Sequence, residues 1–519
     1  MKKHYEILKI TSLNVYAISK ELQMNNLSAV KNVVIAGGGT AGWMAAAALA
    51  KLIGNKLNIT LVESDEISTV GVGEATIPPL LTFHKMLKID EAEFMSSVNA
   101  TFKLGINFEN WKDTSSEYFH SFGTTGRDCW ATTFLQFYNR SKKEGYQAKY
   151  EEYCLELQAG LNEKFAHLPN SGLKYAYHMD ATLYAKFLRN ISEKHGVKRI
   201  EGKIEQVNID ENSGFINSLT LLSGKTIEGD LFIDCTGFKG VLIEQALHTG
   251  YDDWSHWLPC DRAVAVQTES TENPKPYTRS IAHESGWQWK IPLQNRTGNG
   301  LVYCSKYLTD ENAEKLLLEN VDGKLLKKPL FIKFTPGQRR KHWNKNCVAL
   351  GLSSGFIEPL ESTSIHLIQR GIIRLMQMFP KSGVTDTVIN EYNYQSEEEI
   401  RYIKDFIILH YHVTNRNDSA FWRYCSKMDV PSSLSHRIEL FKEHGYVFKA
   451  PWDLFAENSW VQVMLGQGLS PEMHHPIADM MSTKEQDMFL NGIKSSIAQT
   501  VESLPDHKRY LDQYCKSKT

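Results

Sequence analysis

Apolar runs alternate with a helix-favouring stretch near the start of the chain. Residues 33–36 form a short apolar run that ends at glycines, residues 44–52 are rich in alanine, and residues 59–62 form a second apolar run that ends at Glu63. This order predicts a strand, a helix and a strand, the β-α-β unit that opens a doubly wound α/β sheet. Further apolar runs at residues 231–233 and 347–350 end in small residues and predict two more strands of that sheet.

The C-terminal third has a different periodicity. Apolar residues recur at helical spacing from Ile365 onward, with Gln369, Arg370 and Arg374 between them. The same helical pattern continues through residues 397–411 and returns after Pro471. We therefore expect an α/β module interleaved with a second module over residues 31–380. A mainly helical part follows over residues 381–519, and residues 1–30 form an N-terminal extension, in which Met24 is an alternative start.

Composition and charge exclude some functions. The net charge of −2 argues against a nucleic-acid binder that relies on bulk positive charge. No apolar run approaches the roughly 20 residues of a membrane helix, and Glu6, Lys9 and Ser12 interrupt any apolar signal-peptide core. Eight scattered cysteines without a C-x-x-C pair predict reduced thiols, no metal site and a cytoplasmic protein.

A glycine loop follows the first predicted strand. Gly37, Gly39 and Gly42 satisfy the G-x-G-x-x-G pattern, in which the glycines permit a tight turn and a close approach of the backbone to a pyrophosphate. Amides at the start of the following helix then face the phosphates. Glu63 ends the second strand and is placed to accept from a ribose hydroxyl. The loop predicts a dinucleotide site and does not distinguish NAD from FAD.

Several unlinked motifs resemble the flavin-dependent tryptophan halogenase family. They are residues 71–78 (GVGEATIP), the W-x-W-x-I-P signature at Trp287, Trp289, Ile291 and Pro292, residues 356–363 (FIEPLEST), and a stretch over residues 405–422. The similarity runs from about residue 33 to residue 468. It implies an FAD-binding, flavin monooxygenase-like doubly wound core with a β-sheet substrate part, and it gives the helical C-terminal part a substrate-capping role.

The resemblance also implies the chemistry. In this family a separate flavin reductase supplies reduced FAD, oxygen and a halide ion yield hypohalous acid, and an aromatic substrate is halogenated. The implied FAD contacts are Gly37, Gly39, Thr40, Ala41, Gly42, Glu63, Val70, Ala75, Ile204, Leu352 and Ile365. No metal, nucleic acid or membrane takes part, and a homodimer is the candidate assembly.

Lys103 matches the catalytic lysine of the family. Residues 99–108 alternate as one strand, in which Lys103 shares a face with Gly105 and Asn107, and by itself this pattern predicts a lysine that faces solvent. The resemblance instead places Lys103 beside hypohalous acid. An ammonium would donate a hydrogen bond to it, whereas a buried free amine would form a haloamine. The sequence leaves both open.

The catalytic carboxylate of the family matches Glu361, and its sequence context favours it over Glu358. For either glutamate, the residues alone predict an acid placed favourably near a helix start. The hydroxyls of residues 362–364 predict N-capping of the following helix. The family binds halide through backbone groups that match Thr363 and Ser364. Glycine is usual at the second position, so Ser364 departs from the pattern. Bromide and chloride both stay open, with bromide favoured.

Two aromatic segments bear on the substrate. Trp287 and Trp289 lie two residues apart and share one face of a predicted strand, which is typical of core packing. We hypothesise that these indoles keep substrate away from the flavin, so that only hypohalous acid reaches Lys103. His120 and Phe122 match a family pair that sandwiches an indole ring.

The C-terminal side of the expected pocket departs from the family. Enzymes that act on free tryptophan carry a tyrosine-rich stretch there, whereas residues 457–468 contain no tyrosine. Glu457 and Trp460 are the substrate-binding candidates in this stretch, and an indole-type substrate is favoured over free tryptophan. The alternatives are a flavin hydroxylase, a pyridine-nucleotide dehydrogenase, and a non-catalytic flavin-binding protein.

Overall fold

A computed structural model describes residues 29–66, 73–168 and 172–518. The expected N-terminal extension (residues 1–30) falls almost entirely outside the described residues. Val70, one of the expected FAD contacts, and the first two residues of the 71–78 motif also lie outside them.

The predicted β-α-β unit is confirmed as β1 (Asn32–Ala36), α2 (Thr40–Leu52) and β2 (Asn58–Glu63). It belongs to a six-stranded sheet of order β20-β21-β12-β1-β2-β8, in which every pair except β20/β21 is parallel. The remaining strands are β8 (Lys198–Glu201), β12 (Leu231–Asp234), β20 (Trp343–Asn344) and β21 (Cys347–Ala349). Both runs predicted as further strands, residues 231–233 and 347–350, are therefore strands of this sheet.

The six-stranded sheet is buried on both faces. Val33 and Ile35 of β1 pack into one apolar cluster with helix α2, whereas Val34 and Ala36 pack into a second cluster on the other side. Continuous apolar runs are what such a doubly covered parallel sheet requires. The second cluster is closed by a small sheet made of β9 (Ile204–Ile209), β10 (Ile216–Leu221) and β11 (Thr226–Glu228).

A seven-stranded sheet of order β18-β14-β17-β16-β15-β5-β6 forms the second module. Its strands are β5 (Gly105–Glu109), β6 (Glu117–Ser121), β14 (Arg262–Glu269), β15 (Thr278–His283), β16 (Gly286–Pro292), β17 (Arg296–Tyr303) and β18 (Leu330–Lys333). The strand predicted for the tryptophan segment is β16. Trp287, Trp289 and Ile291 lie on one face of it, in an apolar cluster with the C-terminal helices.

The single strand predicted over residues 99–108 is wrong. β4 (Thr101–Lys103) pairs with β7 (Ala176–Met179), and β7 also pairs with β3 (Glu74–Ala75). The chain leaves that small sheet at Leu104, whose amide bonds to Pro276 O, and enters the seven-stranded sheet at β5. The alternation of apolar and polar residues continues across this change of partners, so the pattern alone does not reveal the break.

Other elements connect these sheets. A third small sheet is formed by β13 (Tyr251–Asp253), β19 (Gly337–Arg339) and β22 (Gly355–Phe356). The helices before the C-terminal part are α3 (Pro79–Met86), α4 (Glu91–Ser97), α5 (Phe134–Lys143), α6 (Leu155–Leu161), α7 (Ala181–Lys194) and α8 (Asp310–Glu319). Short helical turns are η1 (Gly54–Lys56), η2 (Tyr150–Tyr153), η3 (Gly237–Lys239), η4 (Val241–Ala246), η5 (Gly351–Ser353), η6 (Pro359–Glu361) and η7 (Pro476–Met480).

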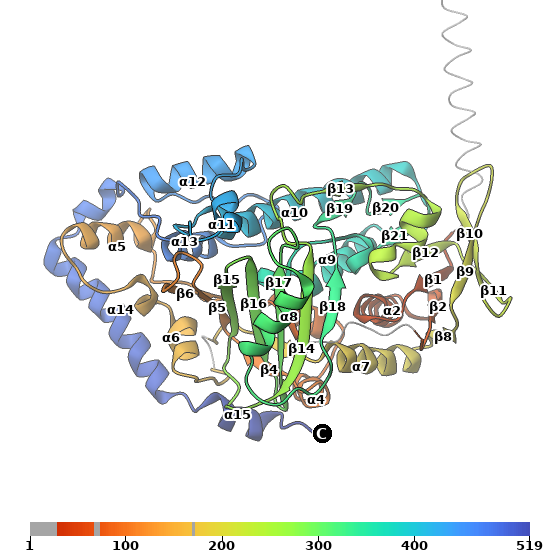
Figure 1. Cartoon of the computed structure of the whole chain (residues 1–519), viewed down its shortest axis with the longest axis horizontal. Coiled ribbons are helices and arrows are strands. Elements are labelled where there is room, and N and C mark those ends of the chain that lie inside the picture. Colours follow the sequence, from red (N-terminus) through yellow and green to blue (C-terminus); the bar gives the residue numbers. More distant parts are fainter. Residues whose placement is uncertain (1–28, 67–72, 169–171, 519) are drawn as a thin grey trace, which may run out of the picture.

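The predicted helical C-terminal part is confirmed. It contains α9 (Ser364–Gln377), α10 (Asp386–His412), α11 (Ala420–Cys425), α12 (Ser432–His444), α13 (Glu457–Gly466), α14 (Thr483–Ser503) and α15 (His507–Tyr514). In Figure 1 the blue helices α11 to α14 gather at the end of the molecule where β5 and β6 lie, away from β1, β2 and α2. In the described parts of the chain, none of the helices combines the length and the apolar character needed to cross a membrane.

Helix α13 is fixed to β6 by buried polar contacts. Gln462 accepts from the Ser121 amide (2.8 Å) and donates to Ser121 Oγ (3.1 Å) and Thr125 Oγ1 (3.0 Å). Asn458 accepts from the Thr125 amide and donates to Gly123 O. These bonds cover an edge strand whose backbone groups would otherwise be open to pairing.

The variant Gln462→Leu tests this contact. We expect a loss of about 1–3 kcal/mol in the free energy of unfolding, because the buried Ser121 amide loses its acceptor. Urea unfolding followed by circular dichroism measures the loss. The exposed Gln206 in β9 offers a matched control, Gln206→Leu, whose effect should stay within about 0.5 kcal/mol. Equal effects of the two substitutions would contradict the assignment.

Candidate active site

The glycine loop forms a cradle at the carboxyl end of β1. Gly37 has a φ of +107°, and a Cβ there would lie 2.2 Å from Cys235 O. A Cβ at Gly42 would lie 1.9 Å from Gly37 O, so only glycine allows α2 to start this close to the strand. Gly39 precedes α2, and no side chain caps the helix. The amides of Thr40 and Ala41 at the helix start are therefore suited to an anion.

Glu63 ends β2 beside this cradle. Its Oε1 accepts from Arg199 Nε of β8 (2.5 Å) and lies 3.6 Å from Arg189 of α7. The two arginines hold the carboxylate beside the glycine loop, and its contact with a ribose hydroxyl stays a prediction.

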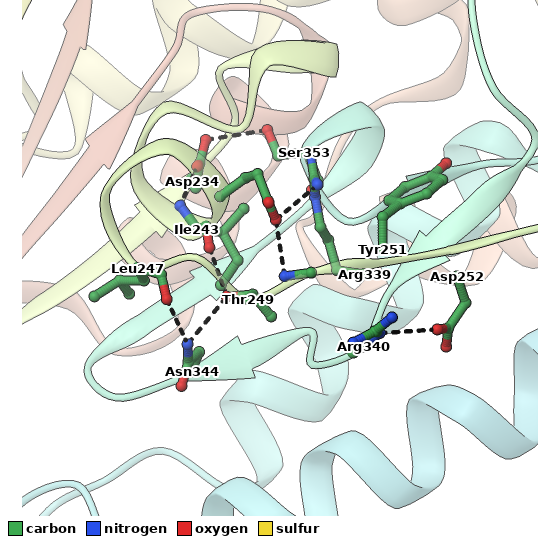
Figure 2. A network of polar contacts seen from close by, with 12 residues as sticks. Asp234, Ile243, Leu247, Thr249, Tyr251, Asp252, Arg339, Arg340, Asn344 and Ser353 are labelled. Atoms are coloured by element: carbon green, nitrogen blue, oxygen red, sulfur yellow. Dashed lines mark hydrogen bonds and ion pairs between the residues drawn. The ribbon is translucent and has the colours of Figure 1, made fainter.

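Loops after β12 and β21 are fixed by one carboxylate (Figure 2). Asp234 accepts from the Leu242 and Ile243 amides (both 2.8 Å) at the start of η4, and from Ser353 Oγ (3.0 Å) in η5. Arg339 of β19 donates to Ser353 O. These contacts hold Leu352, in the middle of η5, at the edge of the sheet where the glycine loop lies.

Of the other expected FAD contacts, Ile365 lies in the first turn of α9, in the same apolar cluster as Ala41. Ala75 lies in β3, and Ile204 starts β9 in the cluster on the opposite face of the sheet. The flavin contacts of these residues stay predictions.

Lys103 is completely buried, so the solvent-facing position expected from the pattern alone is wrong. Its ammonium donates to Ser362 Oγ (2.7 Å) and to Thr76 O (3.1 Å), and it lies 5.3 Å from the centre of the Phe122 ring. Burial lowers the pKa of Lys103 to about 7, although the Glu361 carboxylate acts in the opposite direction. The side chain can therefore be either an ammonium or a free amine near neutral pH.

Glu361 is a buried carboxylate held by two histidines. Both of its oxygens lie within 3.0 Å of His120 Nδ1, and its Oε1 lies 2.8 Å from His410 Nε2. Burial alone would raise the pKa of Glu361, but the contacts with His120 and His410 outweigh it and lower the pKa to about 2. Glu361 is therefore an anion at neutral pH.

The protonation of His410 follows from its two neighbours. Burial lowers the pKa of His410, and Glu361 opposes this shift only in part. A neutral ring that donates from Nε2 to Glu361 must accept at Nδ1, and Tyr118 Oη lies 2.9 Å from that atom. The pKa of Tyr118 is raised well above its ordinary value by burial, so Tyr118 keeps the proton it donates.

Glu358, the competitor of Glu361, has other surroundings. Its Oε2 accepts from Trp287 Nε1 (2.9 Å) and Tyr411 Oη (2.6 Å). Burial raises the pKa of Glu358 to about 7, and the two hydrogen bonds oppose this shift. The two glutamates lie three residues apart, and opposite environments separate their pKa values.

The hydroxyls of residues 362–364 do not cap helix α9 as predicted. Thr363 precedes the helix in an αR conformation without a side-chain capping bond, and its Oγ1 has no hydrogen-bond partner among the described residues. Ser362 adopts a left-handed conformation (φ +59°) that turns its hydroxyl toward Lys103 instead. The amides at the start of α9 therefore stay free of side-chain caps, as the predicted halide site requires.

The expected substrate residues fall into two groups. His120 and Phe122 flank the Lys103–Glu361 pair, and His120 also contacts Phe406 and Phe455. Trp460 lies behind them, packed on Phe406. Glu457 is exposed at the start of α13, where its carboxylate accepts from the Lys449 amide. Its substrate contact stays a prediction.

Sequence reasoning missed His410, Tyr118, Ser362 and Gln462, which complete the site. His410 was visible only as part of the residue 405–422 motif, without a role. Tyr118 stands two residues before His120 on the same face of β6, a spacing that offered a usable signal. The contacts of Ser362 and Gln462 depend on chain segments more than 250 residues away.

The glycine cradle, the uncapped helix start and Glu63 together fit a dinucleotide cofactor, and the protein also buries a lysine in β4 and a carboxylate in η6. This combination defines a nucleotide-binding α/β protein that also buries a separate lysine and carboxylate. The tryptophan halogenase family profile matches residues 32–483.

Similar proteins and similar solved structures are also halogenases. A tryptophan 6-halogenase, SttH, from Streptomyces toxytricini is 35% identical over 92% of this chain and 97% of its own length. Xcc4156, a flavin-dependent halogenase from Xanthomonas campestris, superimposes with a TM-score of 0.93 at 56% identity, covering 95% of this chain and 99% of its own. BrvH, a flavin-dependent halogenase from Brevundimonas sp. BAL3, superimposes with a TM-score of 0.89 at 41% identity, covering 93% and 98%.

The chain therefore belongs to the tryptophan halogenase family. It is a flavin-dependent halogenase, an oxidoreductase that uses reduced FAD from a separate flavin reductase and a halide ion as co-substrate. The hydroxylase, the dehydrogenase and the non-catalytic flavoprotein considered from the sequence are not supported.

The variant Lys103→Met tests the buried ammonium. Its expected effect is a rise in melting temperature that is largest below pH 7 and shrinks as the pH approaches 10.5. The folded pKa lies below the unfolded one, so burying the charge destabilises the native state fully at low pH and not at all once both states are neutral. Each pKa unit is worth about 1.4 kcal/mol. Differential scanning calorimetry between about pH 6 and about pH 10 measures the trend, and a pH-independent difference would contradict it.

Proposed function

We propose that Lys103 and Glu361 carry out the halogenation step, on an indole-type substrate. The observation that carries this proposal is the complete burial of an ammonium with a pKa near 7 beside a buried carboxylate with a pKa near 2. Such opposed shifts are typical of catalytic sites. Bound FADH2 supplies the electrons for the reduction of O2, and the resulting oxidising equivalent converts halide to hypohalous acid.

Lys103 binds the electrophile. As an ammonium it donates a hydrogen bond to hypohalous acid, and as a free amine it can form a haloamine. The contacts with Ser362 Oγ and Thr76 O fix Nζ above the ring of Phe122. The halogen is therefore delivered to the substrate from the side of Lys103. The pKa near 7 leaves both forms accessible.

Glu361 stabilises charge that develops on the substrate. Attack of an aromatic ring on electrophilic halogen gives a cationic ring that must lose a proton. A fixed carboxylate with a low pKa is a weak base, but the ring proton of such a cation is strongly acidic. Because His120 and His410 hold the anion in place, it needs no reorganisation when the cation forms.

The halide site is assigned to the backbone at Thr363 and Ser364. Uncapped amides at the start of α9 suit an anion whichever side chain they carry. Ser364 in place of the usual glycine therefore keeps the site, and bromide is the favoured halide.

The substrate is assigned to the space next to His120 and Phe122. Residues 381–519 form the substrate-capping part, with the wall of Phe406, Phe455 and Trp460 behind His120. The relative SttH acts on tryptophan by name, but α13 of this chain offers no tyrosine for the amino-acid group. Indole or a substituted indole fits this stretch better. The homodimer and the cytoplasmic location stay predictions.

The variant Lys103→Ala should abolish the halogenated product. Loss of the group that binds the electrophile is expected to reduce kcat by at least roughly 10²–10⁴-fold, with the consumption of reduced flavin unchanged. The measurement is product mass in an assay with indole, bromide and a flavin reductase. The exposed Lys186 of α7 provides the matched control, Lys186→Ala, which should keep full activity. An active Lys103→Ala enzyme would remove Lys103 from the mechanism.

Substrate and halide choice are tested together by competition. We expect indole and 3-substituted indoles without a charged amino-acid group to react faster than free tryptophan, because α13 has no groups to pair with that zwitterion. With equal bromide and chloride, brominated product should dominate. Mass spectrometry of a mixed-substrate reaction gives both ratios at once. Preferential conversion of tryptophan would exclude the indole-type assignment and leave the role of Lys103 untouched.

A further inference from the structure

The turn that carries Glu361 starts with a second buried carboxyl group that the halogenation step does not use. Glu358 is fully buried, and one oxygen, Oε2, accepts both of its hydrogen bonds, from Trp287 on β16 and from Tyr411 on α10. Its other oxygen, Oε1, has no hydrogen-bond partner among the described residues. A buried polar group of this kind needs a physical explanation.

Both ends of turn η6 are attached to the same helix. His410 and Tyr411 are consecutive residues of α10: His410 contacts Glu361 at the end of the turn, and Tyr411 donates to Glu358 at its start. The third attachment comes from β16 through Trp287. The turn between them is only three residues long, so a shift of Glu358 is passed on to Glu361 and to the next residue, Ser362, which holds Lys103.

We propose that Glu358 is a positioning residue for halogenation and that Trp287 acts through it, as a hydrogen-bond donor that fixes the turn carrying Glu361 and Ser362. This rests on the proposed role of Glu361. It assigns the first tryptophan of the W-x-W-x-I-P signature a role different from that of a bulky wall, because a wall would use the ring and this contact uses the indole N–H.

The two tryptophans of the signature are unequal in this respect. They lie on the same face of β16 with their rings 6.1 Å apart. Trp287 donates to Glu358, whereas Trp289 Nε1 is buried without a hydrogen-bond partner among the described residues. The hypothesis that both indoles only exclude substrate treats them alike, so the structure offers an internal control.

The surroundings of Glu358 favour the neutral acid. The titratable groups that face it are Tyr411 of α10, Cys260 before β14, Cys304 after β17 and Cys425 of α11, and burial raises the pKa of each, so all four stay neutral. None of these groups supplies a positive charge. A proton on Oε1 leaves Oε2 as a carbonyl oxygen that accepts two hydrogen bonds. It also keeps a second negative charge away from Glu361.

The first experiment reads the contact itself, in protein without flavin or substrate. In protein labelled with ¹⁵N-tryptophan, the Trp287 indole N–H signal, assigned by its loss in Trp287→Phe, should shift with a midpoint near pH 7. The shift should vanish in Glu358→Gln, which keeps the acceptor but cannot ionise, and persist in Trp289→Phe. A Trp287 signal that does not change between about pH 5.5 and about pH 9, or that still titrates in Glu358→Gln, overturns the proposal.

The second experiment reads the consequence for catalysis. Trp287→Phe keeps a smaller aromatic ring and removes the N–H. It should lower kcat by roughly tenfold to 10²-fold, the effect of a small displacement of a catalytic group, with the KM for indole within about twofold. Glu358→Gln, in contrast, should match the wild-type kcat near pH 6.5 and keep that value above pH 8, where ionised Glu358 slows the wild-type enzyme.

The third experiment measures how the stability of Glu358→Gln depends on pH. The folded pKa of Glu358 lies above its unfolded value, so the contribution of Glu358 to stability falls as the pH rises from 4.5 to about 7 and is then constant. The melting temperature of Glu358→Gln relative to wild type should therefore rise over that range. If Trp287→Phe has an unchanged kcat and Glu361→Gln is inactive, the positioning role of Glu358 and Trp287 is overturned and the proposed function stands. If Glu361→Gln were also fully active, the proposed function itself would fail.

Discussion

The structure depends on the burial of one charge, the Glu361 carboxylate. An ionised carboxylate in an apolar interior is unstable unless it is paired and hydrogen-bonded. Here His120 from the edge strand β6 and His410 from the long helix α10 supply the partners, and Tyr118 fixes the tautomer of His410. The carboxylate therefore requires the seven-stranded sheet and the C-terminal helices to be assembled on each other, which joins its proposed catalytic role to the docking of the two parts.

Lys103 is buried by a change of sheets. If residues 99–108 were a single strand, Lys103 would face the side of Gly105 and Asn107. The chain instead pairs with β7 up to Lys103 and with β15 and β6 from Gly105 onward. The ammonium thus lies between two sheets, against the loop at Ser362. That position removes it from water and lowers its pKa, which suits the proposed role of binding an electrophilic halogen near neutral pH.

Much of this arrangement could be predicted from local patterns. The glycine loop, β1, α2, β2, β12, β21 and α9 follow from apolar runs and turn residues, since each is decided by neighbours in the chain. Lys103 and Glu361 were found by motif, but their environments were not, because the contacts with Ser362, His120 and His410 join segments far apart in sequence. The capping role given to residues 362–364 failed for the same reason. Lys103, 259 residues earlier, takes the hydroxyl of Ser362, and Thr363 at the N-cap position lies in an αR conformation without a side-chain capping bond.

Helix α9 lies between the expected FAD site and the proposed halogenation site. Its first residues, Ser364 and Ile365, follow the turn that carries Glu361, and one turn later Ile368 packs on Gly351, where a Cβ would also lie 3.0 Å from Ala41 of the glycine-loop helix. Because a helix is stiff over this length, the expected halide site and the expected pyrophosphate site keep a fixed separation. In the proposed mechanism, hypohalous acid formed at one end therefore has a constant path to Lys103. It follows that a substitution at Ala41 or Gly351 that pushes α9 would change halogenation without touching Lys103 or Glu361.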